Sequence, residues 1–414
     1  EGSFYTIKQL WSPVQIMNTS VDKQFDGKFS VENRYDFLNL NTCRFLWKQV
    51  KFPTATDASN TTAQVLKQGE VQGSDVAAHL AGVLDIKTTI LPDADALFLT
   101  AIDRYGHELW RWTFPVNKLN QANEVLSPLS NKVTSTETEN ELTVKAKNHT
   151  FIFSKKDGQL KGVSVNNRKI SFANGPRFIG ARRADRSLDQ FYNHDDEKAK
   201  EKDRTYSEFP DAAVFTKLDV KEDGGNLIVT ADYKLGNLDK VQWTINPNGE
   251  AVLDYTYNFS GVVDLMGICF DYPEDQVISK RWLGAGPYRV WQNRIHGTQY
   301  DVWENDYNDP IPGETFTYPE FKGYFGSVSW MNIRTKEGTI SLTNETPDAY
   351  IGVYQPRDGR DRLLYTLPES GISVLNVIPP VRNKVNSTDL CGPSSQPKWV
   401  NGPQSGRIIF RFME

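Results

Sequence analysis

The sequence lacks the features that would mark a membrane protein or a nucleic-acid-binding protein. Its 414 residues contain no apolar stretch of roughly eighteen residues, the length that a membrane-spanning helix needs. Its formal net charge of -5 comes from interleaved acids and bases, without a basic block that could neutralise a run of phosphates. We therefore predict neither a membrane nor a nucleic acid as partner.

Cysteine and histidine are also scarce. Cys43, Cys269 and Cys391 are far apart, and they form neither a Cys-x-x-Cys pair nor a group with any of the 5 histidines. This pattern implies no zinc site and no disulfide framework, so we predict buried free thiols, no metal site and no cofactor. Cysteine usage leaves the compartment open, and we favour a periplasmic or extracellular location over the cytoplasm.

Several catalytic and fold signatures are missing. The chain has no Gly-x-Ser-x-Gly elbow and no Cys/His nucleophile pair, and Gly284-Ala285-Gly286 lacks the third glycine of a phosphate cradle. Helical periodicity is scarce, and no βαβ alternation appears. The sequence therefore predicts neither a doubly wound sheet nor a TIM barrel.

Period-two alternation, the signal of half-buried strands, dominates instead. Between Phe29 and Phe37 the apolar side chains fall on one face, and the same pattern recurs at 142–147 and 229–234. Asp157-Gly158 and Asn248-Gly249 lie between alternating runs and indicate tight hairpin turns, because glycine tolerates the positive φ that such turns require. We predict an all-β fold.

A polar stretch suggests how the chain divides. The strand-rich first part ends at Trp110-Arg-Trp-Thr-Phe114 and gives way to polar residues 117–140. We predict an immunoglobulin-like β-sandwich at 1–125, a linker at 126–140 and a larger two-sheet domain at 141–414. The charged segment 195–204 is expected to be a surface loop or a short helix.

One stretch concentrates acids and aromatic residues. Residues 300–310 contain Asp301, Glu304, Asp306 and Asp309 with three aromatic side chains, a composition that suits sugars or simply a well-packed loop with solvated acids. Two histidines are alternative candidates for a general base in a mutarotase-like site: His194, which lies beside two aspartates, and His296. An exposed position would remove either histidine from that role.

The most specific motif is Arg281-Trp-Leu-Gly-Ala-Gly-Pro-Tyr288 followed by Arg294. It resembles a segment in the last domain of family 2 β-galactosidases. Residues 151–162 and 316–330 resemble the opening and the middle of that domain. Residues 29–52 and 106–112 are similar to the sandwich that follows the catalytic barrel, and residues 5–16 are similar to the exit from the barrel.

This resemblance implies a galactose-mutarotase-like β-supersandwich for 141–414. The family's two catalytic glutamates belong to the barrel, so no residue here is expected to inherit them. The family also has a tryptophan near its C-terminus that stacks on the sugar, and Trp399 is its counterpart, although the family's Gly-Gly-Asp-x-Ser-Trp pattern is absent. Residues 177–185 replace the family's Trp-Arg-Ala-Pro-x-Asp-Asn-Asp, which leaves the identity of the sugar open.

We therefore predict the non-catalytic C-terminal portion of a β-galactosidase-like glycoside hydrolase, which scaffolds the barrel and completes its carbohydrate pocket. The partners would be a β-linked glycan and the catalytic barrel of the parent polypeptide, and a homo-oligomer stays open. The alternatives are a free-standing carbohydrate-binding protein and an independent mutarotase-like or lyase-like enzyme. The predicted substrate-binding residues are Trp399, Trp303, Trp291, Arg294, Asp301 and Glu304.

Overall fold

The fold is all-β, as predicted from the alternating pattern. The computed structural model describes residues 2–57, 62–116, 132–183, 206–209, 211–306, 323–353, 370–380 and 392–414. Its described parts contain one α-helix, α1 (Gly2–Leu10), and strands that are nearly all antiparallel to their neighbours. This helix was not predicted, although Phe4, Ile7 and Trp11 recur at helical spacing, because alternation with a period of two was taken as the main signal along the chain.

The chain divides into two compact units. The first contains residues 1–121 together with two short later stretches, 283–288 and 295–303. The second contains 122–282, 289–294 and 304–414. Strand β8 (Thr134–Glu137) lies within the range that we predicted as a linker.

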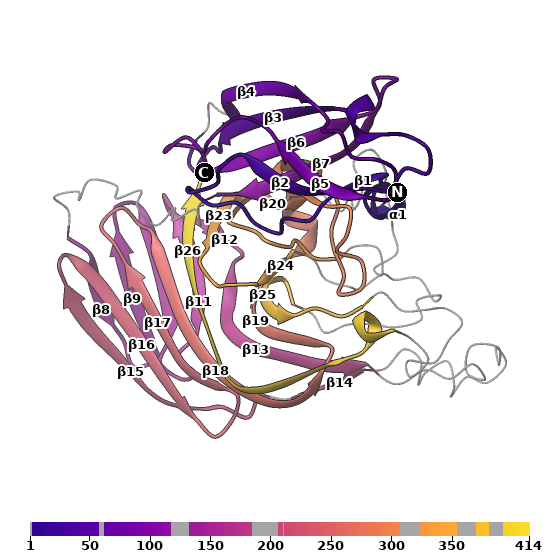
Figure 1. Ribbon diagram of the computed structural model, residues 1–414. Helices are drawn as coiled ribbons and strands as arrows, with labels where there is room; N and C mark the ends of the chain where they lie inside the picture. Colours follow the sequence, from indigo (N-terminus) through magenta and orange to yellow (C-terminus); the bar gives the residue numbers. More distant parts are fainter. Residues whose placement is uncertain are drawn as a thin grey trace. The chain divides into compact units, whose positions relative to one another are not determined.

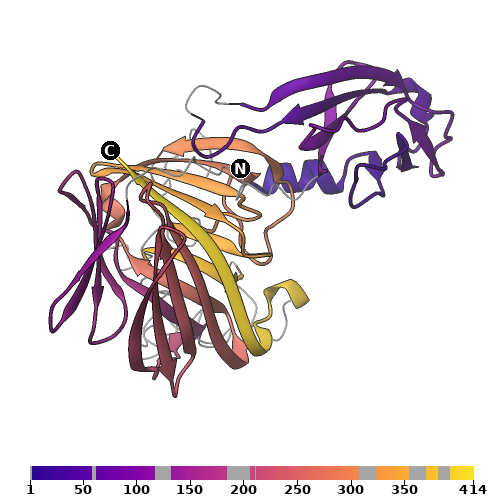
Figure 2. The same cartoon turned by 90° about the vertical axis from the view of Figure 1, so that its left-hand side faces the viewer.

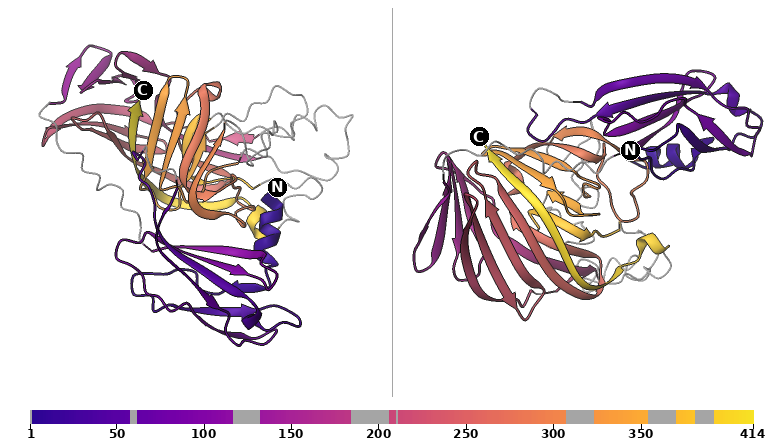
Figure 3. Two further views of the ribbon diagram at one scale, coloured as in Figure 1. Left: turned by 90° about the horizontal axis from the view of Figure 1, so that it is seen from above. Right: turned by 60° about the vertical axis from the view of Figure 1, so that its left-hand side comes forward.

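The first unit consists of two antiparallel sheets. Figure 3 shows its strands in indigo and purple, with α1 beside them. The three-stranded sheet has the order β1-β2-β5 and the four-stranded sheet has the order β4-β3-β6-β7. The bounds are β1 (Val14–Ile16), β2 (Lys28–Asn33), β3 (Arg44–Lys51), β4 (Gln64–Gln72), β5 (Ala81–Asp85), β6 (Ala96–Ile102) and β7 (Glu108–Pro115), with a 3-10 turn η1 (Leu40–Thr42).

The first unit's core lies between these two sheets. Phe29 packs on Phe114 at a ring distance of 5.1 Å, and both side chains are buried. Strand β2 ends earlier than predicted, and Phe37 is 94% exposed. The reason is the buried Asn33, whose side chain donates to the carbonyls of Leu38 and Val76 and accepts from the amide of Tyr35, so that the chain turns away from the sheet.

Residues far along the chain complete the first unit. The hydroxyl of Thr6 donates to the carbonyl of His296 at 2.9 Å, and the side chain of Gln9 accepts from the amide of Gly297 at 2.6 Å. Arg111, on β7, forms an ion pair with Asp301 at 3.0 Å. The stretch 295–303 is therefore held to the helix and to β7 by hydrogen bonds and by charge.

The strands of the second unit belong to two large antiparallel sheets (Figure 1), the second of which also includes residues 283–286 and 299–303. In its described part the first of them has ten strands, with the order β24-β25-β19-β13-β11-β10-β9-β8, and with β12 paired to β11 and β14 paired to β13. The bounds are β8 (Thr134–Glu137), β9 (Glu141–Ala146), β10 (His149–Ser154), β11 (Leu160–Val165), β12 (Arg168–Ile170), β13 (Ala173–Arg183), β14 (Tyr206–Glu208), β19 (Leu265–Asp271), β24 (Tyr350–Val353) and β25 (Ile372–Val377).

The second sheet has nine described strands with the order β15-β16-β17-β18-β26-β23-β22-β20-β21. Its long strand β26, in yellow in Figure 2, runs alongside β18. The bounds are β15 (Val214–Asp223), β16 (Asn226–Lys234), β17 (Leu238–Ile245), β18 (Ala251–Val263), β20 (Val277–Gly286), β21 (Gln299–Asp306), β22 (Trp330–Thr335), β23 (Gly338–Asn344) and β26 (Lys398–Met413). The 3-10 turns are η3 (Glu274–Gln276) and η6 (Pro393–Ser395).

An aromatic core joins these two sheets. Phe172, which lies between β12 and β13, stacks on Phe270 of β19 at 4.5 Å and packs on Phe410 of β26 at 5.1 Å. Trp243 of β17 also contacts Phe270 and Phe410, at 6.1 and 5.9 Å. Burial of one such ring contributes about 1.5–3 kcal/mol, and each aromatic pair adds about 0.5–1.5 kcal/mol. The two sheets therefore form one sandwich, which confirms the predicted supersandwich.

The Asn248-Gly249 turn confirms the clearest predicted hairpin. It joins β17 to β18, with Ile245 paired to Ala251, and Gly249 adopts a φ of +87°. A Cβ at Gly249 would lie 2.1 Å from Nδ1 of His149 on β10. Glycine is thus required here both by the turn and by the close approach of the imidazole.

Candidate functional site

Trp399 is the most exposed of the tryptophans predicted to bind substrate. Its side chain is 70% exposed, and it lies at the start of β26, where it pairs with Val262 of β18. The short turn η6 precedes it, with Pro393 at the first position, where a fixed φ favours a helical start. We call residues 392–399 the Trp399 loop.

Two side chains brace the Trp399 loop. The amide nitrogen of Gln292 donates to the carbonyls of Ser394 at 2.9 Å and Gln396 at 2.7 Å. The amide nitrogen of Asn293 donates to the hydroxyl of Ser395 at 3.0 Å. Three hydrogen bonds thus restrict the loop that presents the exposed indole, and such restriction lowers the entropy that a ligand would otherwise have to remove.

Sequence reasoning did not single out Gln292 and Asn293. They lie between Trp291 and Arg294, inside the segment that resembles family 2 β-galactosidases, and this position was the only signal for them. Trp291 is 3% exposed and packs edge-to-face on Tyr324 at 5.5 Å, so its ring does not offer an exposed surface on which a sugar could stack. Its backbone pairs with that of exposed Arg294.

Asp301 and Trp303 belong to the first unit. Burial raises the pKa of Asp301, and the neighbouring Arg111 opposes that rise. The guanidinium of Arg111 also lies over the ring of Phe98 at 4.7 Å, in a hollow of about 410 Å³. The indole of half-buried Trp303 donates to the carbonyls of Gly284 and Gln299 at 3.2 and 3.1 Å.

The remaining candidates are dispersed. Glu304 and Asp306 are exposed, whereas half-buried Asp301 is paired with Arg111. His296 is exposed, which removes it as the general base of a mutarotase-like site. His194, Asp309 and Cys391 lie outside the described residues. Cys43 and Cys269 are buried free thiols.

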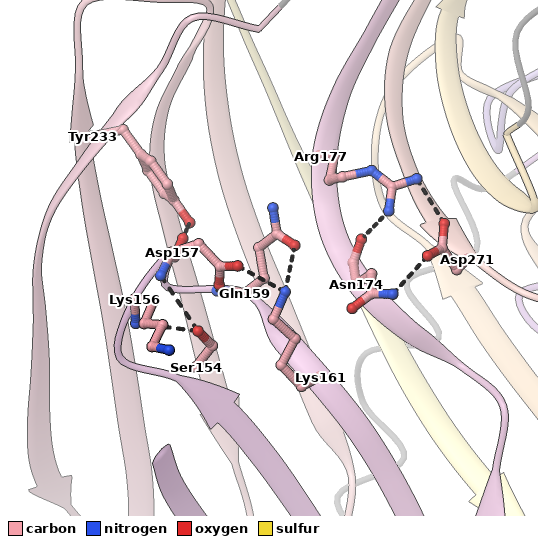
Figure 4. Close-up of polar contacts among 9 residues, drawn as sticks. All are labelled: Ser154, Lys156, Asp157, Gln159, Lys161, Asn174, Arg177, Tyr233 and Asp271. Carbon is pink, nitrogen blue, oxygen red and sulfur yellow. Dashed lines mark hydrogen bonds and ion pairs between the residues drawn. The ribbon is translucent and has the colours of Figure 1, made fainter. Parts of the chain in front are cut away.

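Two polar clusters lie on the ten-stranded sheet (Figure 4). In the first, Arg177 of β13 pairs with Asp271 of β19 at 2.7 Å and donates to the carbonyl of Asn174, whose amide also donates to Asp271. In the second, at the turn between β10 and β11, Asp157 pairs with Lys161 at 2.7 Å. The phenol of Tyr233 donates there to the carbonyl of Asp157.

The contacts within these two clusters stabilise the charged form of each carboxylate. Burial works against the charge of Asp271, but hydrogen bonds from Arg177 and Asn174 outweigh it and lower the pKa of that carboxyl. The pKa of Asp157 is lowered in the same way, because bonds from Lys161 and the amide of Gln159 outweigh burial. A glycosidase's general acid needs a raised pKa so that it holds its proton near neutrality. Neither carboxyl fits that role.

Burial has a different effect on Cys269, which lies beneath Arg177. It raises the pKa of the thiol to about 11, and the guanidinium only partly opposes this rise. The thiol therefore stays protonated at neutral pH and is a poor nucleophile. Among the residues that the structure describes, no three His, Cys, Asp or Glu side chains gather as metal ligands would, and no helix has the length and apolarity to span a membrane.

The fold and the site together define the class of protein: an all-β protein whose larger part is a two-sheet antiparallel sandwich with an exposed tryptophan on a braced loop. Residues 145–377 match the family model described as beta galactosidase small chain. Because this match includes more than half of the sequence, the chain belongs to the β-galactosidase small chain family. The resemblance recognised at 281–294 is thereby confirmed.

The remaining comparisons give distant similarities. No curated protein sequence matches the chain. A galactose 1-epimerase from Lactobacillus acidophilus NCFM is 9% identical, in an alignment that covers 68% of this chain and 98% of that chain with a TM-score of 0.38. A copper-containing benzylamine oxidase from Hansenula polymorpha is 6% identical, with 90% and 77% of the two chains covered and a TM-score of 0.27.

Proposed function

We propose that this chain is the non-catalytic part of a β-galactosidase-like glycoside hydrolase. It associates with a catalytic chain that carries the barrel, and it lends Trp399 to one wall of the carbohydrate pocket. The observation that carries the proposal is the 70% exposed indole on a loop that Gln292 and Asn293 brace. An aromatic ring held in a fixed position stacks well on the apolar face of a sugar.

The distribution of charge supports a non-catalytic role. Asp271 and Asp157 have lowered pKa values and are paired with bases. Asp301, whose pKa is raised by burial, is engaged by Arg111 on one oxygen and by the amide of Val302 on the other. Retaining hydrolysis needs an acid and a second carboxylate about 5 Å apart. Because these three carboxylates are engaged by bases or amides, the hydrolytic step is assigned to the partner.

The test is hydrolysis of a panel of nitrophenyl β-glycosides by this chain alone, by its catalytic partner region alone, and by the two together. We expect activity only when the partner is present, and a higher kcat/KM in the mixture than with the partner alone. Activity in this chain by itself would contradict the proposal. So would a partner whose activity and specificity are the same with and without this chain.

The role of Trp399 is tested by Trp399→Ala in the mixture. We expect KM to rise about three- to tenfold with a small change in kcat, since one lost aromatic contact is worth about 0.5–1.5 kcal/mol. Trp11→Ala is the matched control, because Trp11 is 79% exposed and lies outside the Trp399 loop. Equal KM values for Trp399→Ala and the unchanged chain would remove Trp399 from the pocket.

A further inference from the structure

The outward face of β18 and β26 carries a row of mostly polar side chains, interrupted by Val262, Trp399 and Pro403. The two strands pair without a shift of register from Ala251–Phe410 to Val263–Lys398. Along β26 the burial alternates from Trp399 to Arg407, with every second residue exposed. The cross-strand pairs on this exposed face are Val262–Trp399, Ser260–Asn401, Asn258–Pro403, Thr256–Ser405 and Asp254–Arg407.

A hollow of about 420 Å³ lies at the far end of this row from Trp399. Arg407 donates to both carboxylate oxygens of Asp254, at 3.0 and 3.2 Å, and forms an ion pair with Glu345 at 3.2 Å. Lys240 and Gln242 of β17 line the same hollow. Arg407, Asp254 and Glu345 are already ordered by their mutual contacts, so a ligand would lose little free energy in fixing these three side chains.

The chemistry of this face restricts what it can bind. Both strands are interior to the nine-stranded sheet, β18 lying between β17 and β26, so a peptide cannot add to them as an extra strand. Hydroxyl and amide groups dominate the row, as in Ser260, Asn401 and Thr256, which disfavours an apolar protein or lipid surface. In the hollow, two cations (Lys240 and Arg407) balance two anions (Asp254 and Glu345), which favours an uncharged ligand.

We propose that this face, which we name the β18–β26 track, binds a linear, neutral β-linked oligosaccharide. Trp399 stacks on one sugar ring, and the hollow beside Arg407 holds a second, distant sugar unit through charge-assisted hydrogen bonds to its hydroxyls. The eight residue steps from Trp399 to Arg407 span about 26 Å of strand, so the ligand is a chain of several sugars. The inference rests on the carbohydrate-binding part of the proposed function and extends it to substrate length.

The experiment measures the affinity of the full chain for linear β-1,4-linked galactose and glucose oligosaccharides of two to six units, by titration calorimetry. Arg407→Ala combined with Asp254→Ala removes the distal groups. Arg44→Ala combined with Glu70→Ala is the matched control, because it removes another exposed cross-strand pair, at 3.0 Å, from the first unit. Loss of an exposed ion pair costs little stability, so both double variants should fold, and circular dichroism checks this.

For the unchanged chain we expect affinity to rise with oligosaccharide length in at least one series. The distal double variant should bind the disaccharide normally and the hexasaccharide about tenfold more weakly, which corresponds to the loss of one or two charge-assisted hydrogen bonds. The control should behave as the unchanged chain does, and Trp399→Ala should weaken binding at every length.

The outcomes separate this inference from the proposed function. If oligosaccharides bind through Trp399 but the distal double variant keeps the full length dependence, the track is wrong and the pocket role of Trp399 stands. If no oligosaccharide of any length binds and Trp399→Ala leaves hydrolysis by the mixture unchanged, both proposals fail. The track is supported if the distal double variant binds the long oligosaccharides more weakly but the short ones normally, and if the Arg44→Ala/Glu70→Ala control shows no such change.

Discussion

His149 is a buried histidine with a structural role. Its side chain is 9% exposed, its Nε2 donates to the carbonyl of Phe412 at 2.8 Å, and its ring stacks on Phe151 at 6.2 Å. Burial lowers the pKa of His149, and the bond to Phe412 only partly opposes this. The imidazole therefore joins β10 to the last residues of β26 in its neutral form, across the two sheets of the sandwich.

This histidine should make stability depend on pH in a defined direction. Above pH 6.5 it is neutral in the folded and unfolded states and has no effect. As the pH falls below 6.5, the unfolded chain takes up a proton that the folded chain does not, so the free energy of unfolding falls until the folded pKa is reached. Each unit of difference between the two pKa values removes about 1.4 kcal/mol.

The measurement is the melting temperature of the unchanged chain and of His149→Gln between pH 7.5 and pH 4.5. Glutamine keeps a donor but cannot be charged, so its melting temperature should fall less over this range. His79→Gln serves as the control, because the side chain of His79 is 64% exposed. Parallel curves for the unchanged chain and His149→Gln would contradict the prediction.

The residue types around the tryptophans could not predict which of these side chains are exposed. Trp291 and Trp399 occur in equally polar sequence surroundings, yet one is 3% and the other 70% exposed. The difference depends on Tyr324, which covers Trp291, and on hydrogen bonds that hold the Trp399 loop outward. Both are contacts between segments distant in sequence, which the local pattern does not contain.

At the scale of single elements, the hairpins were the most predictable part of the fold. The pattern around Asn248-Gly249 identified the buried face of β17 and β18 correctly, from Val241 to Phe259. Local chemistry decides such turns, because few residues tolerate a positive φ. Strand ends were less predictable: β2 stops at Asn33 through contacts to Val76, and β26 begins as early as Lys398 because β18 pairs with it from there to Phe410.

The Asn248-Gly249 hairpin offers a test of close packing between elements. Gly249→Ala would place a methyl group at positive φ and 2.1 Å from His149. We therefore expect the free energy of unfolding to fall by about 2–4 kcal/mol, from backbone strain and overpacking together. Gly224→Ala is the control, because Gly224 has a φ of +57° in another hairpin but nothing within 4 Å of a new Cβ. Urea unfolding should give Gly224→Ala a loss of only about 1 kcal/mol. Equal losses would show that the His149 contact relaxes freely.

At the scale of the whole molecule, the first unit is assembled from three separate stretches of chain. The predicted bounds of 1–125 and 141–414 could not include this, because the contacts that bring 295–303 to β7 and α1 span 190 and 288 residues. Composition and periodicity describe neighbours in sequence, so they gave no sign of it.

The Arg111–Asp301 ion pair should stabilise the first unit and leave the stability of the second unit unchanged. Both side chains are mostly covered, so Asp301→Ala leaves a partly buried guanidinium without its carboxylate and should cost about 1–3 kcal/mol. Hydrogen-exchange mass spectrometry should show faster exchange in peptides from β6 and β7, and unchanged exchange in peptides from β16 and β17. Glu304→Ala, at an exposed position on the same strand, should change neither. Faster exchange throughout both units would contradict this assignment.

The same arrangement has a consequence for biosynthesis. Residues 1–121 leave the ribosome before Gly297 and Asp301, which follow about 180 residues later. At roughly 5–20 residues per second, the early strands wait on the order of ten to forty seconds for the stretch that binds Gln9 and Arg111. During that interval the nascent first sandwich carries an Arg111 without its partner Asp301 and a Phe52 without the ring of Tyr300, so its packing is completed only when translation passes residue 303.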